Sequence, residues 1–142
     1  MTTTEQSRSI VERLHLEIFQ KGRMELLDEI VAEDYVVHTP TGDQSRDRHF
    51  GEELPMFLNA FPDLAFHPLD RIAEGDKVVT RFVFTGTHDG EFQGIPATGR
   101  EIELPGIVIE RVEAGKVVET WVQRNDLSLL QQLGVAPAPG SG

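Results

Sequence analysis

Residues 77–87 read KVVTRFVFTGT, and this stretch decides the fold because it is the most strand-like part of the chain. Valine, threonine and phenylalanine fill it, and such residues fit a pleated, half-buried surface. Two similar stretches follow at residues 100–112 and 116–125. Between them, residues 113–115 (EAG) predict a short hairpin turn. Together these stretches predict antiparallel neighbours in one sheet.

Two further strands are expected earlier in the chain. Residues 64–73 contain Leu64, Phe66 and Ile72 and are followed by a turn, residues 74–76 (EGD). Residues 35–38 (YVVH) form a short run of β-prone side chains. The residues that follow, 40–47 (PTGDQSRD), are rich in polar and turn-forming residues, which predicts a loop.

The N-terminal half shows helical periodicity instead. Apolar side chains recur at helical spacing in residues 9–20 and again in residues 24–31. A third helix is expected over residues 49–61, where Pro55 indicates either a kink or a helix that begins close to this residue. Residues 126–133 (DLSLLQQL), followed by a glycine, predict a short closing helix.

Helices therefore come first and strands second, an order typical of an α+β fold with a segregated sheet. We expect about three N-terminal helices packed on a curved antiparallel sheet, with a central pocket where the sheet opens. The 142 residues fit one domain, which we place at residues 1–134. Residues 135–142 are mostly alanine, proline, glycine and serine, which predicts a flexible tail.

The composition argues against several classes of partner. Lysine and arginine number 13 and aspartate and glutamate 24, so the net charge is −11. Such a field repels phosphate backbones and anionic lipid, so we expect neither nucleic-acid nor membrane binding. The absence of cysteine excludes disulfides and thiolate metal sites and is compatible with a reducing compartment. Because the N-terminus MTTTEQSRSIVERL also lacks a signal-peptide pattern, we expect a cytoplasmic protein.

No motif indicates a metal or a cofactor. The five histidines, at positions 15, 38, 49, 67 and 88, show no HxH or HExxH spacing. His88 with Asp89 and Glu91 is too local a group to predict a metal site. The chain has neither a glycine-rich nucleotide loop nor a GxSxG elbow. We therefore expect chemistry without a cofactor.

Six blocks of sequence resemble one known family in their order and spacing. They are FPDL at residues 61–64, IAEGDKVV at 72–79, GTHDGEF at 86–92, GIPATGR at 94–100, GKVVETW at 115–121 and LSLLQQLG at 127–134. Over residues 8–134 the chain is similar to the SnoaL-like polyketide cyclases, or ester cyclases, of the NTF2-like superfamily. The resemblance implies a cone-shaped NTF2-like fold, frequent homodimers and metal-free acid–base chemistry.

By this resemblance the reaction is an intramolecular aldol ring closure of a polyketide ester. Such a reaction needs a base that takes a proton next to a carbonyl, and donors that stabilise the enolate oxygen in a dry pocket. The family places an aspartate four residues after the tryptophan, where this chain has Asn125 followed by Asp126. An amide is no general base. Asp126 therefore either serves instead, if a bulge re-aims it, or caps the closing helix. Asn125 either binds the substrate or lies at a cap or turn.

Four further side chains complete the candidate site. His38 ends the short strand, where the family often has a polar or histidine side chain, and it becomes the leading acid–base candidate if Asn125 has replaced the family acid. Arg81 either holds an enolate or a carboxylate, or lies exposed in an ion pair. Trp121 and Gln123 share one face of a strand and either line the pocket or belong to the core.

The sequence leaves three functions open. The first is a cofactor-free cyclase or isomerase that acts on a hydrophobic carbonyl substrate. The second is a non-catalytic module that binds a small hydrophobic ligand or forms a dimeric scaffold, which the amide of Asn125 favours. The third is an epoxide hydrolase on the same fold, whose Asp–Arg–Asp set would need Arg81, Asp126 and a second carboxylate.

Overall fold

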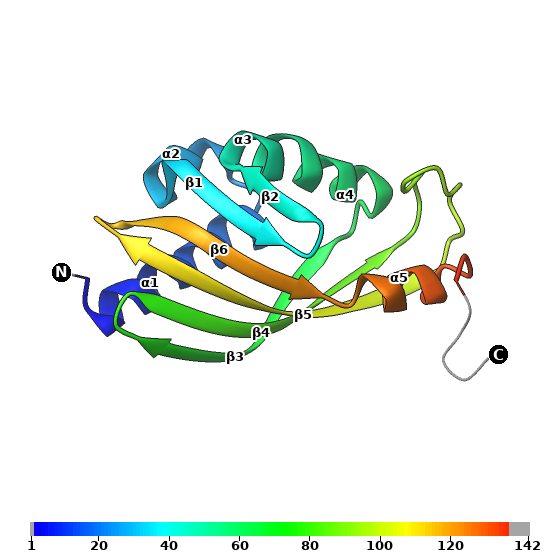
Figure 1. Cartoon of the computed structure of the whole chain (residues 1–142). Helices are drawn as coiled ribbons and strands as arrows, with labels where there is room; N and C mark the ends of the chain where they lie inside the picture. The colour runs from blue at the N-terminus through cyan, green and yellow to red at the C-terminus, as the bar shows by residue number, and fades with distance from the viewer. Residues whose placement is uncertain (1, 137–142) are drawn as a thin grey trace.

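Six strands form one curved sheet, and helices pack along its inner face (Figure 1). The computed structural model describes residues 2–136. The strands are β1 Val31–Thr39, β2 Gly42–Ser45, β3 Ala65–Glu74, β4 Lys77–Thr87, β5 Glu101–Glu113 and β6 Lys116–Arg124. They lie in the order β2-β1-β6-β5-β4-β3. This arrangement is the predicted α+β fold, although part of the predicted tail, residues 137–142, lies outside the described residues.

β3, β4, β5 and β6 follow the prediction to within one or two residues, whereas β1, expected over residues 35–38, begins four residues earlier, and β2 was not expected. Residues 40–47, expected as a loop, contain β2, which pairs antiparallel with β1. Its side chains (GDQS) are polar because it is an edge strand, so strand propensity gave no signal. β1 runs parallel to β6, so the sheet is mixed and the expected wholly antiparallel pairing is wrong at this one place. The helices between β1 and β3 carry the chain to the far edge, and the later strands return by antiparallel steps until β6 reaches β1.

The helices form two runs before the long strands and one short helix after them. They are α1 Thr4–Arg13, π-helical η1 Leu14–Gln20, 3₁₀-helical η2 Met24–Leu26, α2 Leu27–Ile30, α3 Arg46–Arg48, π-helical η3 His49–Glu53, α4 Leu54–Ala60 and α5 Asp126–Gln132. A capping box starts α1, because Thr3 and Gln6 each accept the other's backbone N–H. α4 begins one residue before Pro55, after the π-helical turn. Because Glu53 and Leu54 both have right-handed helical backbone angles, Pro55 lies inside one helical run over residues 46–60, and the helix does not begin at this residue.

Three apolar clusters fill the space between sheet and helices, and the smallest, Phe66, Phe82 and Val108, forms part of the wall of a pocket. The cluster nearer α1 is built around Val11, Leu14, Ile18, Ile30, Val31, Tyr35, Val37, Phe50, Val78, Val112 and Val117. The cluster nearer α5 is built around Phe57, Ala60, Phe61, Phe92, Ile102, Leu104, Leu129 and Leu133. Gly106 lets Phe82 lie across β5, since a Cβ on Gly106 would stand 2.6 Å from Cζ of that ring. Within residues 2–136, the helices are too short or too polar to cross a membrane.

A β-bulge in β6 reverses the alternation of its side chains. Residues 111 and 112 of β5 pair with residues 119 and 117 of β6, so Val118 is an extra residue. Val117 is fully buried on the inner face, and strict alternation would continue inward through residues 119, 121 and 123. After the bulge, Thr120, Val122 and Arg124 face the pocket instead.

A second bulge does the same in β3. Residues 68 and 70 pair with residues 82 and 81 of β4, so Leu69 is the extra residue. Asp70 therefore lies on the outer face, where it forms an ion pair with Arg81. Arg71 lies opposite the fully buried Thr80 and faces the helices. Both bulges change which charged side chains reach the interior.

Candidate functional site

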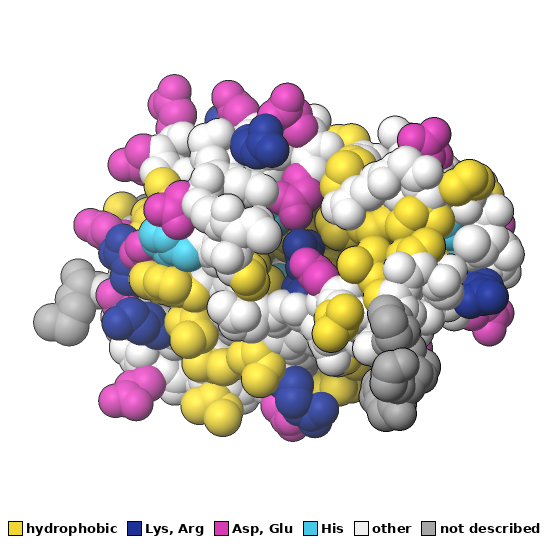
Figure 2. Space-filling model, turned by 45° about the vertical axis from the view of Figure 1, so that its right-hand side comes forward, with side chains coloured by type: hydrophobic (Ala, Val, Ile, Leu, Met, Phe, Trp, Pro, Cys, Tyr) yellow, Lys and Arg dark blue, Asp and Glu magenta, His cyan; other side chains and the backbone are white. Residues whose placement is uncertain are grey.

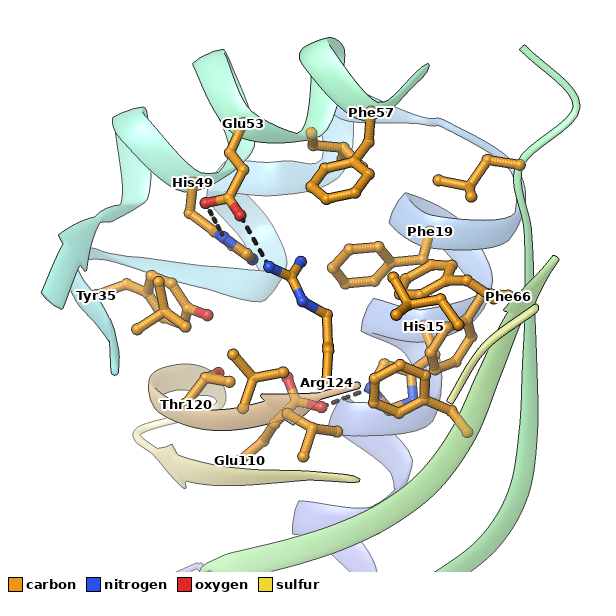
Figure 3. A pocket seen from close by; sticks show the side chains of 18 residues that line it. His15, Phe19, Tyr35, His49, Glu53, Phe57, Phe66, Glu110, Thr120 and Arg124 are labelled. Atoms are coloured by element: carbon orange, nitrogen blue, oxygen red, sulfur yellow. Dashed lines mark hydrogen bonds and ion pairs between the residues drawn. The ribbon is translucent and has the colours of Figure 1, made fainter. Parts of the chain in front are cut away.

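A cavity of about 70 Å³, here called the inner pocket, lies between the sheet and the helices η1, η3 and α4 (Figure 3). Most of its wall is apolar, made by Phe19, Val37, Leu54, Phe57, Leu64, Phe66, Phe82, Phe84, Leu104, Val108 and Val122. Its polar side chains are His15, Tyr35, His49, Glu53, Glu110, Thr120 and Arg124. An apolar surrounding strengthens the electrostatic interactions of these groups relative to water.

His15, Arg71 and Glu110 form a buried chain of hydrogen bonds on one side of the inner pocket. His15 comes from the π-helical η1, Glu110 comes from β5, and both side chains are only 3% exposed. Nε2 of His15 lies 2.5 Å from Oε1 of Glu110, and Nη2 of Arg71 lies 2.8 Å from Nδ1 of His15. The imidazole also packs on Phe66, with ring centroids 4.8 Å apart. The Glu110 carboxylate is thus held in place while it lines the pocket.

Two hydroxyl groups line the inner pocket together with Glu110. Thr120 is its cross-strand partner on β6, and Oγ1 of Thr120 makes no hydrogen bond with any described residue. Tyr35 is 2% exposed and points its hydroxyl toward the same space (Figure 3). Burial, and then the charge of Glu110, raise the pKa of Tyr35 well above its usual range. The hydroxyl of Tyr35 therefore stays protonated at neutral pH and can donate a hydrogen bond.

Arg124 forms the wall between the inner pocket and a second space. Its Nη2 lies 3.3 Å from Oε1 of Glu53, and its Nε lies 3.4 Å from Oδ1 of Asp126. The guanidinium group also lies over the ring of Phe57, 5.1 Å from the centroid. The imidazole of His49, 3.7 Å away, and the charge of Arg124 lower the pKa of Glu53 to about 2. Glu53 is therefore ionised at neutral pH.

The second space, here called the outer hollow, has a volume of about 470 Å³ and shares Glu53, Phe57 and Arg124 with the inner pocket. Its wall also includes Thr41, Gln44, Arg48, Glu52, Met56, Phe92, Gln93, Asp126, Leu129 and Leu130. Figure 2 looks toward the end of the molecule that carries α4 and α5, where basic and acidic side chains lie beside a broad hydrophobic area. Within residues 2–136, no group of three or more histidine, aspartate or glutamate side chains could hold a metal ion.

His38, the leading acid–base candidate of the sequence, does not line the inner pocket. Its Nδ1 lies 2.7 Å from Oδ1 of Asp43 and its Nε2 lies 2.6 Å from Oε2 of Glu119. The ring stacks on Trp121 at a centroid distance of 5.3 Å. Hydrogen bonds to Glu119 and Asp43 raise the pKa of His38 above its ordinary value of 6.5. His38 faces away from the inner pocket because Val37, the residue before it on β1, faces inward, and the bulge at Val118 turns Glu119 and Trp121 outward to meet it.

The other predicted side chains also lie outside the inner pocket. Asn125 caps α5, where its Oδ1 accepts the backbone N–H of Ser128 at 3.1 Å. Asp126 begins that helix and lines the outer hollow. Arg81 is exposed, and Gln123 lies opposite Ile107 on the outer face. The structure thus brings His38 and Trp121 together, away from the inner pocket, and the chemical roles given to all six residues stay predictions.

The sequence does carry a signal for two of the side chains that line the inner pocket. Glu110 occupies the same alternation as Leu104, Val108 and Val112, so it stands in a row of buried positions. His15 directly follows Leu14 on the apolar face of the first helical run. A charged or polar side chain in such a row has to be paired. Arg124 had no comparable signal, because its inward direction depends on the bulge.

These features define a class of protein, a curved α+β domain with an apolar pocket and a few convergent polar groups. The chain belongs to the SnoaL-like polyketide cyclase family, whose model matches residues 9–133. This match confirms the family resemblance and the NTF2-like fold that the six sequence blocks implied.

Solved structures of similar proteins agree with this assignment. The chain is 34% identical to IdmH of Streptomyces antibioticus, titled a "putative polyketide cyclase", over 92% of this chain and 99% of that one, with a TM-score of 0.81. It is 26% identical to AclR of Streptomyces galilaeus, titled a "putative hydroxylase", over 96% and 85% of the two chains, with a TM-score of 0.84. A SnoaL-like protein of Jannaschia sp. CCS1 shares the fold at 22% identity over 97% of each chain, with a TM-score of 0.85. Curated protein sequences give no match.

Proposed function

We propose that this protein is a cofactor-independent cyclase or isomerase that uses acid–base chemistry on a hydrophobic, polyketide-like carbonyl substrate. Glu110 is the base, and Tyr35 and Thr120 donate hydrogen bonds to the enolate oxygen. One observation carries the proposal: a carboxylate held by His15 shares a mostly apolar pocket with the hydroxyl groups of Thr120, its cross-strand partner, and Tyr35. A general base and preorganised donors in a water-poor site are what enolate formation requires.

The proposed reaction begins with proton transfer from carbon. Glu110 takes a proton from the carbon next to the substrate carbonyl, the electron pair of that C–H bond forms a carbon–carbon double bond, and the π pair of the carbonyl moves to its oxygen. The hydroxyl of Tyr35 stabilises the resulting enolate. In a cyclase, the enolate carbon then bonds to a second carbonyl carbon of the same molecule, the π pair of that carbonyl moves to its oxygen, and this oxygen takes up the proton held by Glu110. In an isomerase, the Glu110 proton returns at a different carbon.

The size of the cavity supports a substrate that enters it only in part. A free volume of about 70 Å³ is smaller than the cavity of on the order of 150 Å³ that holds benzene in another protein. A polyketide-like molecule therefore places only its reacting part in the inner pocket and extends into the outer hollow. The shared wall lies at Arg124, whose contacts of 3.3 and 3.4 Å are longer than the 2.6 Å ion pair of Arg81 with Asp70. Arg124 is the side chain that has to move.

Deuterium exchange into a simple ketone tests this function without knowledge of the natural substrate. The probe is 2-tetralone in D₂O, and NMR follows exchange at the carbon next to the carbonyl. The wild-type protein is expected to accelerate exchange above the buffer rate, and Glu110→Gln to lower that acceleration about 10²- to 10⁴-fold. Glu103→Gln, an exposed side chain on the same strand, is the matched control.

No acceleration by the wild-type protein, or equal rates for wild type and Glu110→Gln, would contradict the proposal. Saturable binding of 2-tetralone without exchange would favour the non-catalytic binding module instead.

A second candidate is epoxide hydrolysis, favoured by the two carboxylates that flank Arg124. The expected set around Arg81 does not form, since Arg81 pairs with Asp70 alone on the surface. Glu53 and Asp126 do flank Arg124, at 3.3 and 3.4 Å. The test is conversion of 1-methylcyclohexene oxide to the diol in H₂¹⁸O by wild type and Arg124→Met. Hydrolysis by the wild type that Arg124→Met abolishes would replace the cyclase proposal, and no hydrolysis would remove this candidate.

A further inference from the structure

We propose that Arg71 is a positioning residue, which keeps His15 as a neutral imidazole with its proton on Nε2 and so prepares Glu110 to act as the base. Arg71 does not line the inner pocket, and nothing in the family motifs points to it. The inference rests on the proposed function for the role of Glu110. The state of His15 itself follows from the geometry alone.

The bulge at Leu69 is what brings Arg71 to His15. Without it, strict alternation would turn Asp70 inward and Arg71 outward. A carboxylate in place of the guanidinium would accept a hydrogen bond from Nδ1–H of His15, and its negative charge would favour the imidazolium. The bulge places Asp70 against Arg81 on the surface and leaves a cation beside the imidazole.

The donors and acceptors around the ring then determine which nitrogen of His15 carries the proton. A guanidinium group has only donors, so Nδ1 of His15, 2.8 Å from Nη2 of Arg71, has to accept. In a neutral imidazole the other nitrogen carries the proton, and Nε2 therefore donates to the carboxylate of Glu110. An imidazolium would place an N–H group against the N–H group of Arg71 and two positive charges in contact.

This arrangement matters for the chemistry at Glu110. Beside an imidazolium, Glu110 would form a full ion pair, and its electron pairs would be less available to a substrate proton. The neutral imidazole holds one carboxylate oxygen in place and adds no positive charge. Arg71 acts on the reacting carboxylate only through His15, which is why it is a positioning residue and not a catalytic one.

Nitrogen NMR of ¹⁵N-histidine-labelled full-length protein, without any ligand, tests the proposal directly. At pH 7, His15 is expected to show an unprotonated Nδ1 and a protonated Nε2. Arg71→Met removes the donor at similar length and is expected to give a doubly protonated ring or a mixture of tautomers. Arg71→Lys keeps a charged donor and is expected to restore the wild-type signals. Arg13→Met, which removes an exposed guanidinium from α1, is the control.

Exchange of deuterium into 2-tetralone is the second readout. Arg71→Met is expected to lower the catalytic rate about 10²-fold with little change in the concentration for half-saturation, because misplaced reacting groups cost about that much. Arg71→Lys is expected to recover most of the loss. A His15 that is protonated on Nδ1 in the wild type, or unchanged signals in a folded Arg71→Met, would overturn the proposal. Expected NMR signals with no exchange in any variant would instead refute the proposed function.

Discussion

His15 and His38 lie on opposite faces of the same sheet, and each is held between two charged side chains. His15 is 3% exposed and lies between Arg71 and Glu110, one cation and one anion. His38 is 30% exposed and lies between Asp43 and Glu119, which are both anions. The comparison shows that a histidine with a carboxylate partner is not by itself a catalytic group. The face of the sheet and the charge of the second partner decide what it can do.

The largest expected effect is the difference in stability between matched substitutions of the two histidines. His15→Leu leaves the buried charges of Glu110 and Arg71 without their shared partner, which is expected to cost about 3–5 kcal/mol in the free energy of unfolding. His38→Leu removes only surface pairs, worth about 0–1 kcal/mol. Urea unfolding of both variants measures the difference. Equal losses would show that burial does not separate the two sites.

Tyr35→Phe tests whether a side chain on the inner face of the sheet contributes to activity. Loss of one donor to an enolate oxygen is expected to lower exchange into 2-tetralone about 10²- to 10³-fold. The phenyl ring keeps the packing of Tyr35 on Phe50, so the unfolding free energy is expected to fall by only about 1 kcal/mol. Steady-state rates and thermal unfolding check the two expectations. A variant as active as the wild type would remove Tyr35 from the proposed mechanism.

Glu53 is expected to make the free energy of unfolding depend on pH in the acidic range. Its pKa in the folded protein, about 2, is below the ordinary value of 4.5. Its contribution to stability is therefore fully present above pH 4.5 and is lost as the pH falls from 4.5 toward 2. We expect Glu53→Gln to remove about 2–3 kcal/mol of that pH dependence. Unfolding free energies measured at several pH values test this. Glu119→Gln, on the outer face, is the control and is expected to change the pH dependence between 4.5 and 2 less.

His38 is expected to change the free energy of unfolding at higher pH, by a smaller amount than Glu53 does in acid. Its pKa is raised in the folded protein, so its contribution is fully present below pH 6.5 and is lost as the pH rises through the folded value. His38→Gln is expected to flatten this alkaline decline by less than about 1 kcal/mol, because solvent screens the exposed pairs. Unfolding between pH 5 and 9 is the measurement, and an unchanged decline in the variant would exclude His38 as its source.

Asn125→Asp is expected to have the smallest effect of all. Aspartate caps a helix about as well as asparagine, so the change in stability should stay within a few tenths of a kcal/mol. Asn125 lines neither the inner pocket nor the outer hollow, so no gain of exchange activity is expected. A clear gain in the 2-tetralone assay would instead show that the family aspartate acts from this position.

The sequence predicted the architecture better than the site, and the two bulges explain why. Long apolar alternation identified β3, β4, β5 and β6, whereas the polar edge strand β2 had no such pattern. Alternation predicts the face of the sheet on which a side chain lies only if no residue is inserted, because one extra residue inverts the prediction for every residue after it. Val118 turned Trp121 and Gln123 outward in this way. Leu69 brought in Arg71, which no periodicity could have indicated.

The single extra residue at position 118 also bears on how such a cavity can diversify. Loss of its codon would restore the regular pleat and leave the lining unchanged, because Glu119 would follow Val117 and point outward, and Thr120 would still point inward. A one-residue slip that took Val118 into regular pairing with Arg111 would instead turn Thr120 to water and Trp121 to the interior. A lineage with this fold can therefore lose the bulge and keep its ligand contacts, or exchange those contacts through a change of register without substitution of any residue in the cavity wall.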